Sequence, residues 1–183
     1  MAAVEQLIDV YAFEEFLARP ENRRRLFELI DGRVVEKLPT QEHGYIAGKL
    51  SQHLNNWVDD GHSGIVGVEV RHRPARDFCN DRLPDVSLTL DDTRPIVTRG
   101  AVLSMPDLAV EIKSPSDTYE DMLDVAAYYL QNGCRLVWLF YPSRKTVEVV
   151  SAADRYTLTI DNMLTGGDVL PEFEVPLHRV FRT

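Results

Sequence analysis

The stretch Leu108-Ala109-Val110-Glu111-Ile112-Lys113-Ser114-Pro115-Ser116-Asp117 is a short apolar run that carries an acid and a base two residues apart and then stops at a proline. Successive side chains of a strand point to opposite faces, so Glu111 and Lys113 share one face. The other face carries Leu108, Val110 and Ile112. Ionisable groups are seldom buried unless they pair or bind a metal. The stretch is therefore either a salt-bridged strand end or part of a metal-dependent active site.

The composition is typical of an ordinary soluble globular protein. The chain has 183 residues, of which 44% are hydrophobic and 27% charged, and it is most simply one domain over residues 1–183. No apolar stretch approaches the roughly 20 residues needed to span a bilayer. Residues 1–10 lack the basic-then-apolar order of a signal peptide. We therefore expect a cytoplasmic protein without membrane contact.

The cysteine content and the net charge argue against some kinds of metal site and of nucleic-acid binding. Cys79 and Cys134 lie far apart, which excludes a zinc site made mainly of cysteines and argues against a disulfide in a reducing compartment. The formal net charge is −9, from 29 acids and 20 bases. This charge argues against non-specific nucleic-acid binding by the whole surface, but it is compatible with a local basic groove. An excess of acids is also expected if some of them hold cations.

The hydrophobic pattern predicts an α/β (α+β) fold with a mixed sheet flanked by helices. Asp31-Gly32, between residues 26–30 and 33–36, indicates a hairpin with a two-residue turn. The order strand–helix–strand over residues 107–141 indicates a right-handed crossover and locally parallel strands. Helices are predicted over 11–18, 41–60 with Thr40 as N-cap, and 118–132 with Ser116 or Asp117 as N-cap. Further strands are predicted over 65–71, 83–90, 136–141, 145–150 and 155–160, with a loop over 91–105 and a short helical segment over 175–181.

Three predicted strands carry an acid beside a small residue on one face. The pairs are Glu69 with Gly67, Asp85 with Ser87, and Glu111 with Ala109. Small neighbours leave room for a hydrated cation, and oxygen ligands favour Mg²⁺ or Mn²⁺. An Asp and a Glu on adjacent strands can clamp such an ion, while a nearby lysine orients or deprotonates a bound water. This combination is the one that phosphodiester hydrolysis needs.

The order of these motifs carries a family resemblance. Pro84-Asp85, followed by Glu111-Ile112-Lys113, resembles the PD-(D/E)XK nuclease superfamily. Its companions, in order, are residues 27–32 (FELIDG), 42–44 (EHG), 83–86 (LPDV), 106–112 (PDLAVEI), 114–117 (SPSD), and Tyr129-Leu130 with Asn132-Gly133. Together these motifs resemble the Uma-type restriction endonucleases, a bacterial family once catalogued as a domain of unknown function. The resemblance covers about residues 10 to 181.

The resemblance implies a restriction-endonuclease-like core, to which the sequence pattern adds a β-hairpin at each end, and a bound Mg²⁺ or Mn²⁺. In this family Asp85 and Glu111 would be metal ligands, joined by the peptide carbonyl of Ile112, and Lys113 would be the catalytic lysine. Many members instead carry a lysine in the helix that follows Ser-Pro-Ser-Asp. Val125 occupies that position here, which leaves Lys113 as the candidate.

Supporting roles are expected from residues that match family positions near the site. They are Glu28, His43 and Glu69, for a second ion or for phosphate contact. His43 also has a structural alternative, because an inward-facing histidine on the apolar stripe of a helix is often a hydrogen-bonded core residue.

The predicted function is that of a metal-dependent DNA endonuclease. The densest positive patch is the loop that contains Arg71, Arg73 and Arg76, and a homodimer would gather two such loops around a duplex. Two alternatives stay open: a catalytically weak nucleic-acid-binding or regulatory module on a nuclease scaffold, and a hydrolase for a small phosphorylated molecule. A shared fold does not choose among them.

Overall fold

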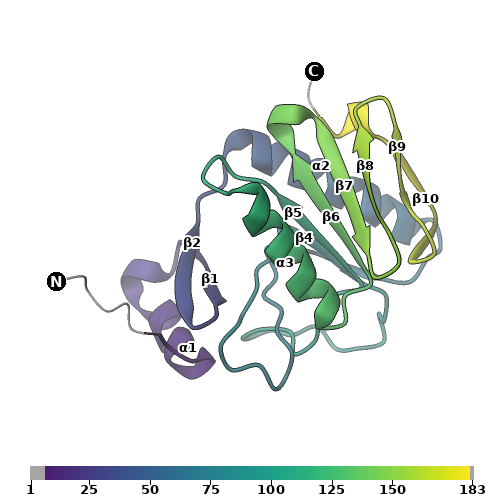
Figure 1. Ribbon diagram of the computed structural model, residues 1–183. Helices are drawn as coiled ribbons and strands as arrows, with labels where there is room; N and C mark the ends of the chain where they lie inside the picture. The colour runs from purple at the N-terminus through teal and green to yellow at the C-terminus, as the bar shows by residue number, and fades with distance from the viewer. Residues whose placement is uncertain (1–6, 182–183) are drawn as a thin grey trace.

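The computed structural model describes residues 7–181 and contains a six-stranded mixed sheet (Figure 1). Its strand order is β3-β4-β5-β6-β7-β8. The bounds are Ile65–Val68 (β3), Val86–Thr89 (β4), Leu108–Ile112 (β5), Leu136–Tyr141 (β6), Thr146–Ser151 (β7) and Arg155–Thr159 (β8). Strands β5 and β6 are parallel and are connected through helix α3 (Tyr119–Gln131), whereas the other neighbours are antiparallel. The mixed sheet and the parallel crossover predicted from the sequence are confirmed.

The N-terminal part forms a separate hairpin beside the main sheet. Helix α1 (Val10–Ala18) and the 3-10 turn η1 (Pro20–Asn22) precede β1 (Leu26–Ile30) and β2 (Arg33–Lys37). Asp31 and Gly32 have φ angles of 49° and 81°, as the predicted two-residue turn requires. Leu29 and Asp81 exchange backbone hydrogen bonds of 2.9 Å, which attach the hairpin to the segment before β4.

The C-terminal part contains a second hairpin that differs from the prediction. Strands β9 (Met163–Gly166) and β10 (Leu170–Pro176) pair antiparallel, and only Leu177–Arg179 forms a helical turn, the 3-10 helix η3. The predicted helical segment over 175–181 was therefore wrong for its first residues. A shift of pairing register between Leu170 and Glu174 puts Leu170 out of step with Phe173 and Val175, so the alternation of apolar residues covers only part of the strand.

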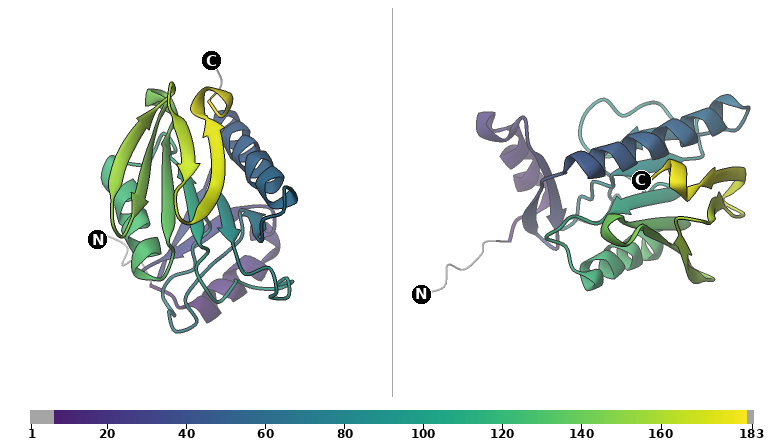
Figure 2. Two further views of the ribbon diagram at one scale, coloured as in Figure 1. Left: turned by 90° about the vertical axis from the view of Figure 1, so that its right-hand side faces the viewer. Right: turned by 90° about the horizontal axis from the view of Figure 1, so that it is seen from above.

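Two helices cover opposite faces of the sheet (Figure 2). Helix α2 (Gln41–Asp59) and the β9–β10 hairpin pack on one face, where Leu50 and Leu54 of α2 join Val110 and Trp138 of the sheet. Helix α3 packs on the other face. Strand β6 is buried along its whole length, followed by the 3-10 turn η2 (Pro142–Arg144). This burial explains why its sequence is apolar on both faces.

Several element ends differ from the sequence prediction. Strand β3 ends at Val68, and Glu69 adopts the left-handed region with φ of 52°. Helix α3 is capped by Thr118, whose hydroxyl accepts the Asp121 amide while the Asp121 carboxylate accepts the Thr118 amide. The predicted cap at Ser116 or Asp117 was wrong, because Asp117 closes a separate turn by accepting the Ser114 amide at 2.6 Å. Over residues 7–181, no helix is long and apolar enough to cross a membrane.

Candidate active site

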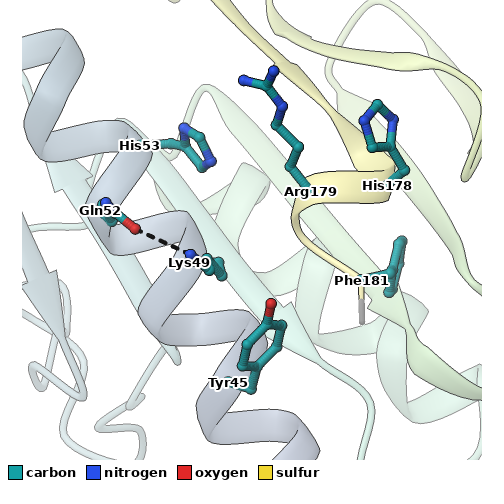
Figure 3. A pocket seen from close by; sticks show the side chains of 7 residues that line it. All are labelled: Tyr45, Lys49, Gln52, His53, His178, Arg179 and Phe181. Atoms are coloured by element: carbon teal, nitrogen blue, oxygen red, sulfur yellow. Dashed lines mark hydrogen bonds between the residues drawn. The ribbon is translucent and has the colours of Figure 1, made fainter. Parts of the chain in front are cut away.

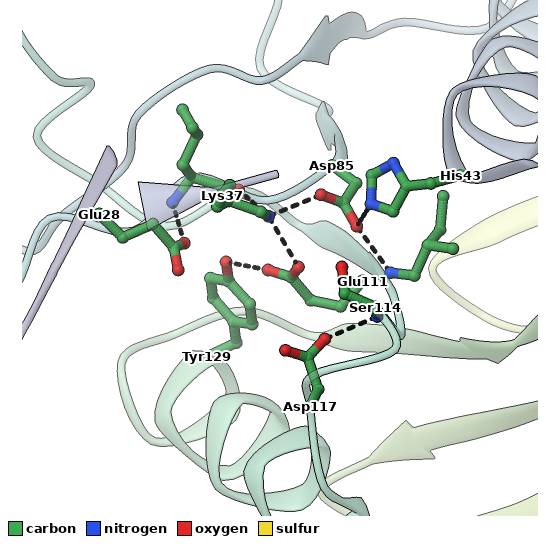
Figure 4. A network of polar contacts seen from close by, with 10 residues as sticks. Glu28, Lys37, His43, Asp85, Glu111, Ser114, Asp117 and Tyr129 are labelled. Atoms are coloured by element: carbon green, nitrogen blue, oxygen red, sulfur yellow. Dashed lines mark hydrogen bonds and ion pairs between the residues drawn. The ribbon is translucent and has the colours of Figure 1, made fainter. Parts of the chain in front are cut away.

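Two buried carboxylates meet where β4 begins and β5 ends (Figure 4). Asp85 directly precedes β4 and is 1% exposed, and Glu111 lies in β5 and is 7% exposed. The Ile112 amide donates a hydrogen bond of 2.6 Å to Asp85 Oδ2, so the backbone of β5 fixes the Asp85 carboxylate. The adjacent strands thus bring together the Asp and the Glu, as the sequence predicted.

A lysine that the sequence prediction missed lies between these carboxylates. Lys37 Nζ is 2.6 Å from Asp85 Oδ1 and 3.2 Å from Glu111 Oε2. It also donates to the Leu83 carbonyl at 2.8 Å. The side chain of Lys37 is 18% exposed, so these contacts form largely away from water, where charge-assisted hydrogen bonds are strongest.

The β1–β2 hairpin explains how Lys37 reaches this position. Glu28 pairs with Val35, and Leu26 pairs with Lys37. Because paired residues point to the same face and the side-chain period is two, Glu28 and Lys37 share one face of the hairpin. Glu28 Oε1 accepts the Leu83 amide at 2.6 Å while Lys37 binds the Leu83 carbonyl. The hairpin register set by the Asp31-Gly32 turn is thus a sequence signal that could have identified Lys37.

Two further side chains orient the carboxylates. His43 Nε2 lies 2.9 Å from Asp85 Oδ2, and its backbone amide donates to Thr40 Oγ1, the N-cap of α2. Tyr129 of α3 donates from its hydroxyl to Glu111 Oε1 at 2.7 Å. His43 is therefore a buried, hydrogen-bonded residue, as its structural alternative predicted, and it also contacts a carboxylate of the site. Tyr129 was not predicted as a site residue.

Burial and neighbouring charges shift the pKa values of the two carboxyl groups in opposite directions. Burial alone would raise the pKa of Asp85, but Lys37 and His43 together lower that pKa below its ordinary value. Burial raises the pKa of Glu111 to about 8, against the opposing charge of Lys37. Burial alone would lower the pKa of Lys37, but the carboxylates of Glu111, Glu28 and Asp85 raise it above its ordinary value. Asp85 is therefore the ionised partner of Lys37 at neutral pH, and Glu111 is the carboxyl that takes up a proton.

The lysine expected from the family motif has a different neighbour. Lys113 Nζ donates to the Ser114 carbonyl at 3.1 Å, and no contact joins it to Asp85 or Glu111 within the described chain. Its backbone amide continues the ladder by donating to the Phe140 carbonyl at 2.9 Å. Val125 packs against the apolar cluster under α3. The structure thus gathers Glu28, His43, Asp85 and Glu111 around Lys37, with Lys113 beside this group.

The other predicted supporting residues lie outside this cluster of contacts. Glu69 follows β3, and its amide donates to the Asp85 carbonyl at 3.3 Å, so its backbone adjoins the site. Arg71 forms ion pairs with Glu14 at 2.7 Å and Asp81 at 3.2 Å, which neutralise much of its charge. Arg73 binds the Val102 carbonyl through its amide at 3.0 Å, and Arg76 is exposed.

The donor set of the site fits a hard divalent ion. Asp85 Oδ1 and Glu111 Oε2 already converge on one positively charged atom, and carboxylate oxygens are the ligands that Mg²⁺ and Mn²⁺ prefer. No group of three or more His, Cys, Asp or Glu side chains forms a metal site between residues 7 and 181. A two-carboxylate site is nevertheless sufficient for Mg²⁺, which commonly keeps several waters and binds through one or two carboxylates.

Comparison with known proteins identifies the family. The model of the Uma2 family, described as "Putative restriction endonuclease", matches residues 13–178. A crystal structure from Anabaena variabilis, of a "putative nuclease belonging to DUF820", superposes with a TM-score of 0.76 at 22% identity and covers 92% of this chain and 96% of that chain. This likeness shows a shared fold. A search of curated proteins found no match. The match over residues 13–178 shows that this chain belongs to the Uma2 family of restriction-endonuclease-like proteins.

Proposed function

We propose that the protein is a metal-dependent DNA endonuclease of the PD-(D/E)XK type. The observation that carries the proposal is the convergence of Asp85 Oδ1 and Glu111 Oε2 on a single cationic atom at the junction of β4 and β5. Membership of the Uma2 family supports the nuclease class. In this proposal Asp85, Glu111 and the Ile112 carbonyl hold Mg²⁺ or Mn²⁺.

In this proposal the residues around the ion position the metal ligands and the attacking water. When bound, the ion would polarise a phosphate and lower the pKa of a water. Asp85 is held ready by the Ile112 amide and by His43, so little reorganisation is needed. Lys113 stands two residues beyond Glu111, and rotation away from the Ser114 carbonyl would let its ammonium orient the attacking water. Glu28 fixes the Leu83 peptide next to Asp85.

DNA is the proposed substrate, and a homodimer is the proposed assembly. Two copies would present two sites to the two strands of a duplex and would double the exposed positive charge near them. The pairing of Arg71 with Glu14 and Asp81 reduces what the loop over residues 71–76 can offer to phosphate. Sedimentation with and without a duplex oligonucleotide tests the assembly.

Cleavage of supercoiled plasmid tests the function. The wild-type protein with Mn²⁺ or Mg²⁺ is expected to nick plasmid, whereas Glu111→Ala and Lys113→Ala are expected to lose this activity. Equal activity in all three proteins would show that a contaminant or another site cuts the DNA. If plasmid stays intact while wild type alone cleaves a chromogenic phosphodiester, the substrate is a small phosphorylated molecule. If nothing is cleaved, the protein is a non-catalytic module.

A further inference from the structure

Three oxygen atoms surround the Lys37 ammonium as ligands surround a bound cation. They belong to Asp85 at 2.6 Å, the Leu83 carbonyl at 2.8 Å and Glu111 at 3.2 Å. Two of these three are the carboxylate oxygens proposed above as metal ligands. The ammonium therefore lies at the point that a divalent ion shared by Asp85 and Glu111 would occupy.

We propose that Lys37 is an internal counter-cation that a divalent metal ion displaces from Asp85 and Glu111. This inference rests on the proposed function, and it adds how ion binding to the same site is controlled. A metal ion at about 2.1 Å from both oxygens would occupy the position between them that the Lys37 ammonium now holds, so the two cations cannot share that position. Repulsion between the two cations at such short range also favours exchange over joint occupancy.

The position of Lys37 in the hairpin allows this exchange. Lys37 is the last residue of β2, and the next residue, Leu38, is 73% exposed. The lysine side chain can therefore leave the carboxylates by rotation about its own bonds, while Glu28 keeps the hairpin attached to the Leu83 amide. A long, unbranched side chain at the end of a strand suits such a movement, because its departure breaks no ladder hydrogen bond.

Acylation of lysines, followed by mass spectrometry, tests the exchange on the intact wild-type protein. An ammonium held by two buried carboxylates reacts slowly with acetic anhydride, and its release speeds the reaction. Saturating Mn²⁺ is therefore expected to raise the labelling rate of Lys37 several-fold, with a midpoint that follows Mn²⁺ binding measured by calorimetry. Labelling of Lys49, which contacts Gln52 outside the site, should stay unchanged, and Asp85→Asn should abolish the Mn²⁺ effect.

The possible outcomes separate this inference from the proposed function. Unchanged Lys37 labelling while calorimetry shows Mn²⁺ bound overturns the exchange and leaves the nuclease proposal standing. Absence of any Mn²⁺ binding overturns both. A rise in labelling that persists in Asp85→Asn also overturns the exchange, because the ion would then act elsewhere.

A second observation concerns a basic groove outside this site. The groove has a volume of about 360 Å³ and lies between α2 and η3 (Figure 3). Its lining contains basic and aromatic side chains, one amide and no carboxylate; the side chains are those of Tyr45, Lys49, Gln52, His53, His178, Arg179 and Phe181. In the described part of the chain, neither Lys49 nor Arg179 forms an ion pair, and Lys49 Nζ contacts Gln52 at 3.4 Å. Burial together with the charges of Lys49 and Arg179 lowers the pKa of His53.

We infer that this groove, called here the α2–η3 groove, binds the phosphate backbone of DNA. Its unpaired positive charge stands out on a chain with a net charge of −9. Lys49 follows His43 by six residues, which is about 9 Å along the helix axis and about a third of a turn around it, so a nucleic acid at the carboxylates would have to continue around α2 to contact this groove. The aromatic rings offer contact area for sugars or unstacked bases. The inference rests on DNA being the substrate.

Fluorescence anisotropy of a labelled duplex in EDTA tests the groove without cleavage. Lys49→Ala combined with Arg179→Ala is expected to weaken binding about tenfold and to lower the salt slope by about 2. Arg24→Ala combined with Arg99→Ala changes the net charge equally at exposed positions outside the groove and serves as the control. Equal weakening in both pairs overturns the inference. So does displacement of the duplex by low-millimolar inorganic phosphate at constant ionic strength, which would indicate a site for a single phosphate group.

Discussion

Replacement of Lys37 by methionine is expected to lower the free energy of unfolding by about 3 kcal/mol in the presence of EDTA. Removing one partner of a buried ion pair typically costs about 3–5 kcal/mol. Asp85 would keep its bonds from the Ile112 amide and His43, and Glu111 can escape by taking up a proton, since its pKa is already about 8. Both effects place the expected cost at the lower end of the range.

Urea unfolding followed by circular dichroism measures this cost. Lys113→Met is the matched control and should cost about 0.5 kcal/mol or less, because Lys113 binds only the Ser114 carbonyl. The cost of Lys37→Met should be larger at pH 8.5 than at pH 6, where Glu111 is protonated. A cost within about 1 kcal/mol of the control at both pH values would refute the view that Lys37 neutralises the buried carboxylates.

Further predictions concern the residues around the site. Tyr129→Phe leaves a buried oxygen of Glu111 without its hydrogen bond and should cost about 1–3 kcal/mol in urea unfolding; an unchanged midpoint would contradict it. His43→Ala should retain the fold by circular dichroism but reduce plasmid nicking at least about tenfold, and full activity would remove His43 from the site. Burial raises the pKa of Asp81 to about 6, so its stabilising contribution is complete below about pH 4 and is lost as the pH rises through about 6. As the pH rises from 4 to 7.5, the free energy of unfolding of Asp81→Asn should therefore increase by about 2 kcal/mol relative to that of the wild type. A difference that does not change with pH would argue against the raised pKa of Asp81.

The sheet could be predicted because its signals are local. The Asp31-Gly32 turn, the Thr40 cap and the uninterrupted apolar run of β6 each specify one element through neighbouring residues. The β9–β10 hairpin could not be predicted in the same way. Its pairing register shifts between Leu170 and Glu174, so Leu170 is out of step with the alternating Phe173 and Val175 and the strand signal is shorter than the strand.

The carboxylates of the site could be predicted from their own strands, whereas the hairpin register could place Lys37 on the face of Glu28 but not next to Asp85 and Glu111. Asp85 and Glu111 can be recognised in the sequence because each is an acid that shares a face of its predicted strand with a small residue. Lys37 and Tyr129 come from a hairpin and a helix 74 and 18 residues away from Glu111 in sequence. Lys113 is closer in sequence, but its ammonium has a nearer acceptor in the Ser114 carbonyl. Tertiary docking of the hairpin therefore decides which lysine meets the carboxylates.

A crystal structure of the protein with Mn²⁺, using anomalous scattering to locate the ion, tests the central claim most directly. The account predicts an anomalous peak between Asp85 Oδ1 and Glu111 Oε2, at roughly 2.1–2.3 Å from each, with Lys37 Nζ moved away from both oxygens. A structure at saturating Mn²⁺ with no peak at this position, and with Lys37 still bound to both carboxylates, would contradict it.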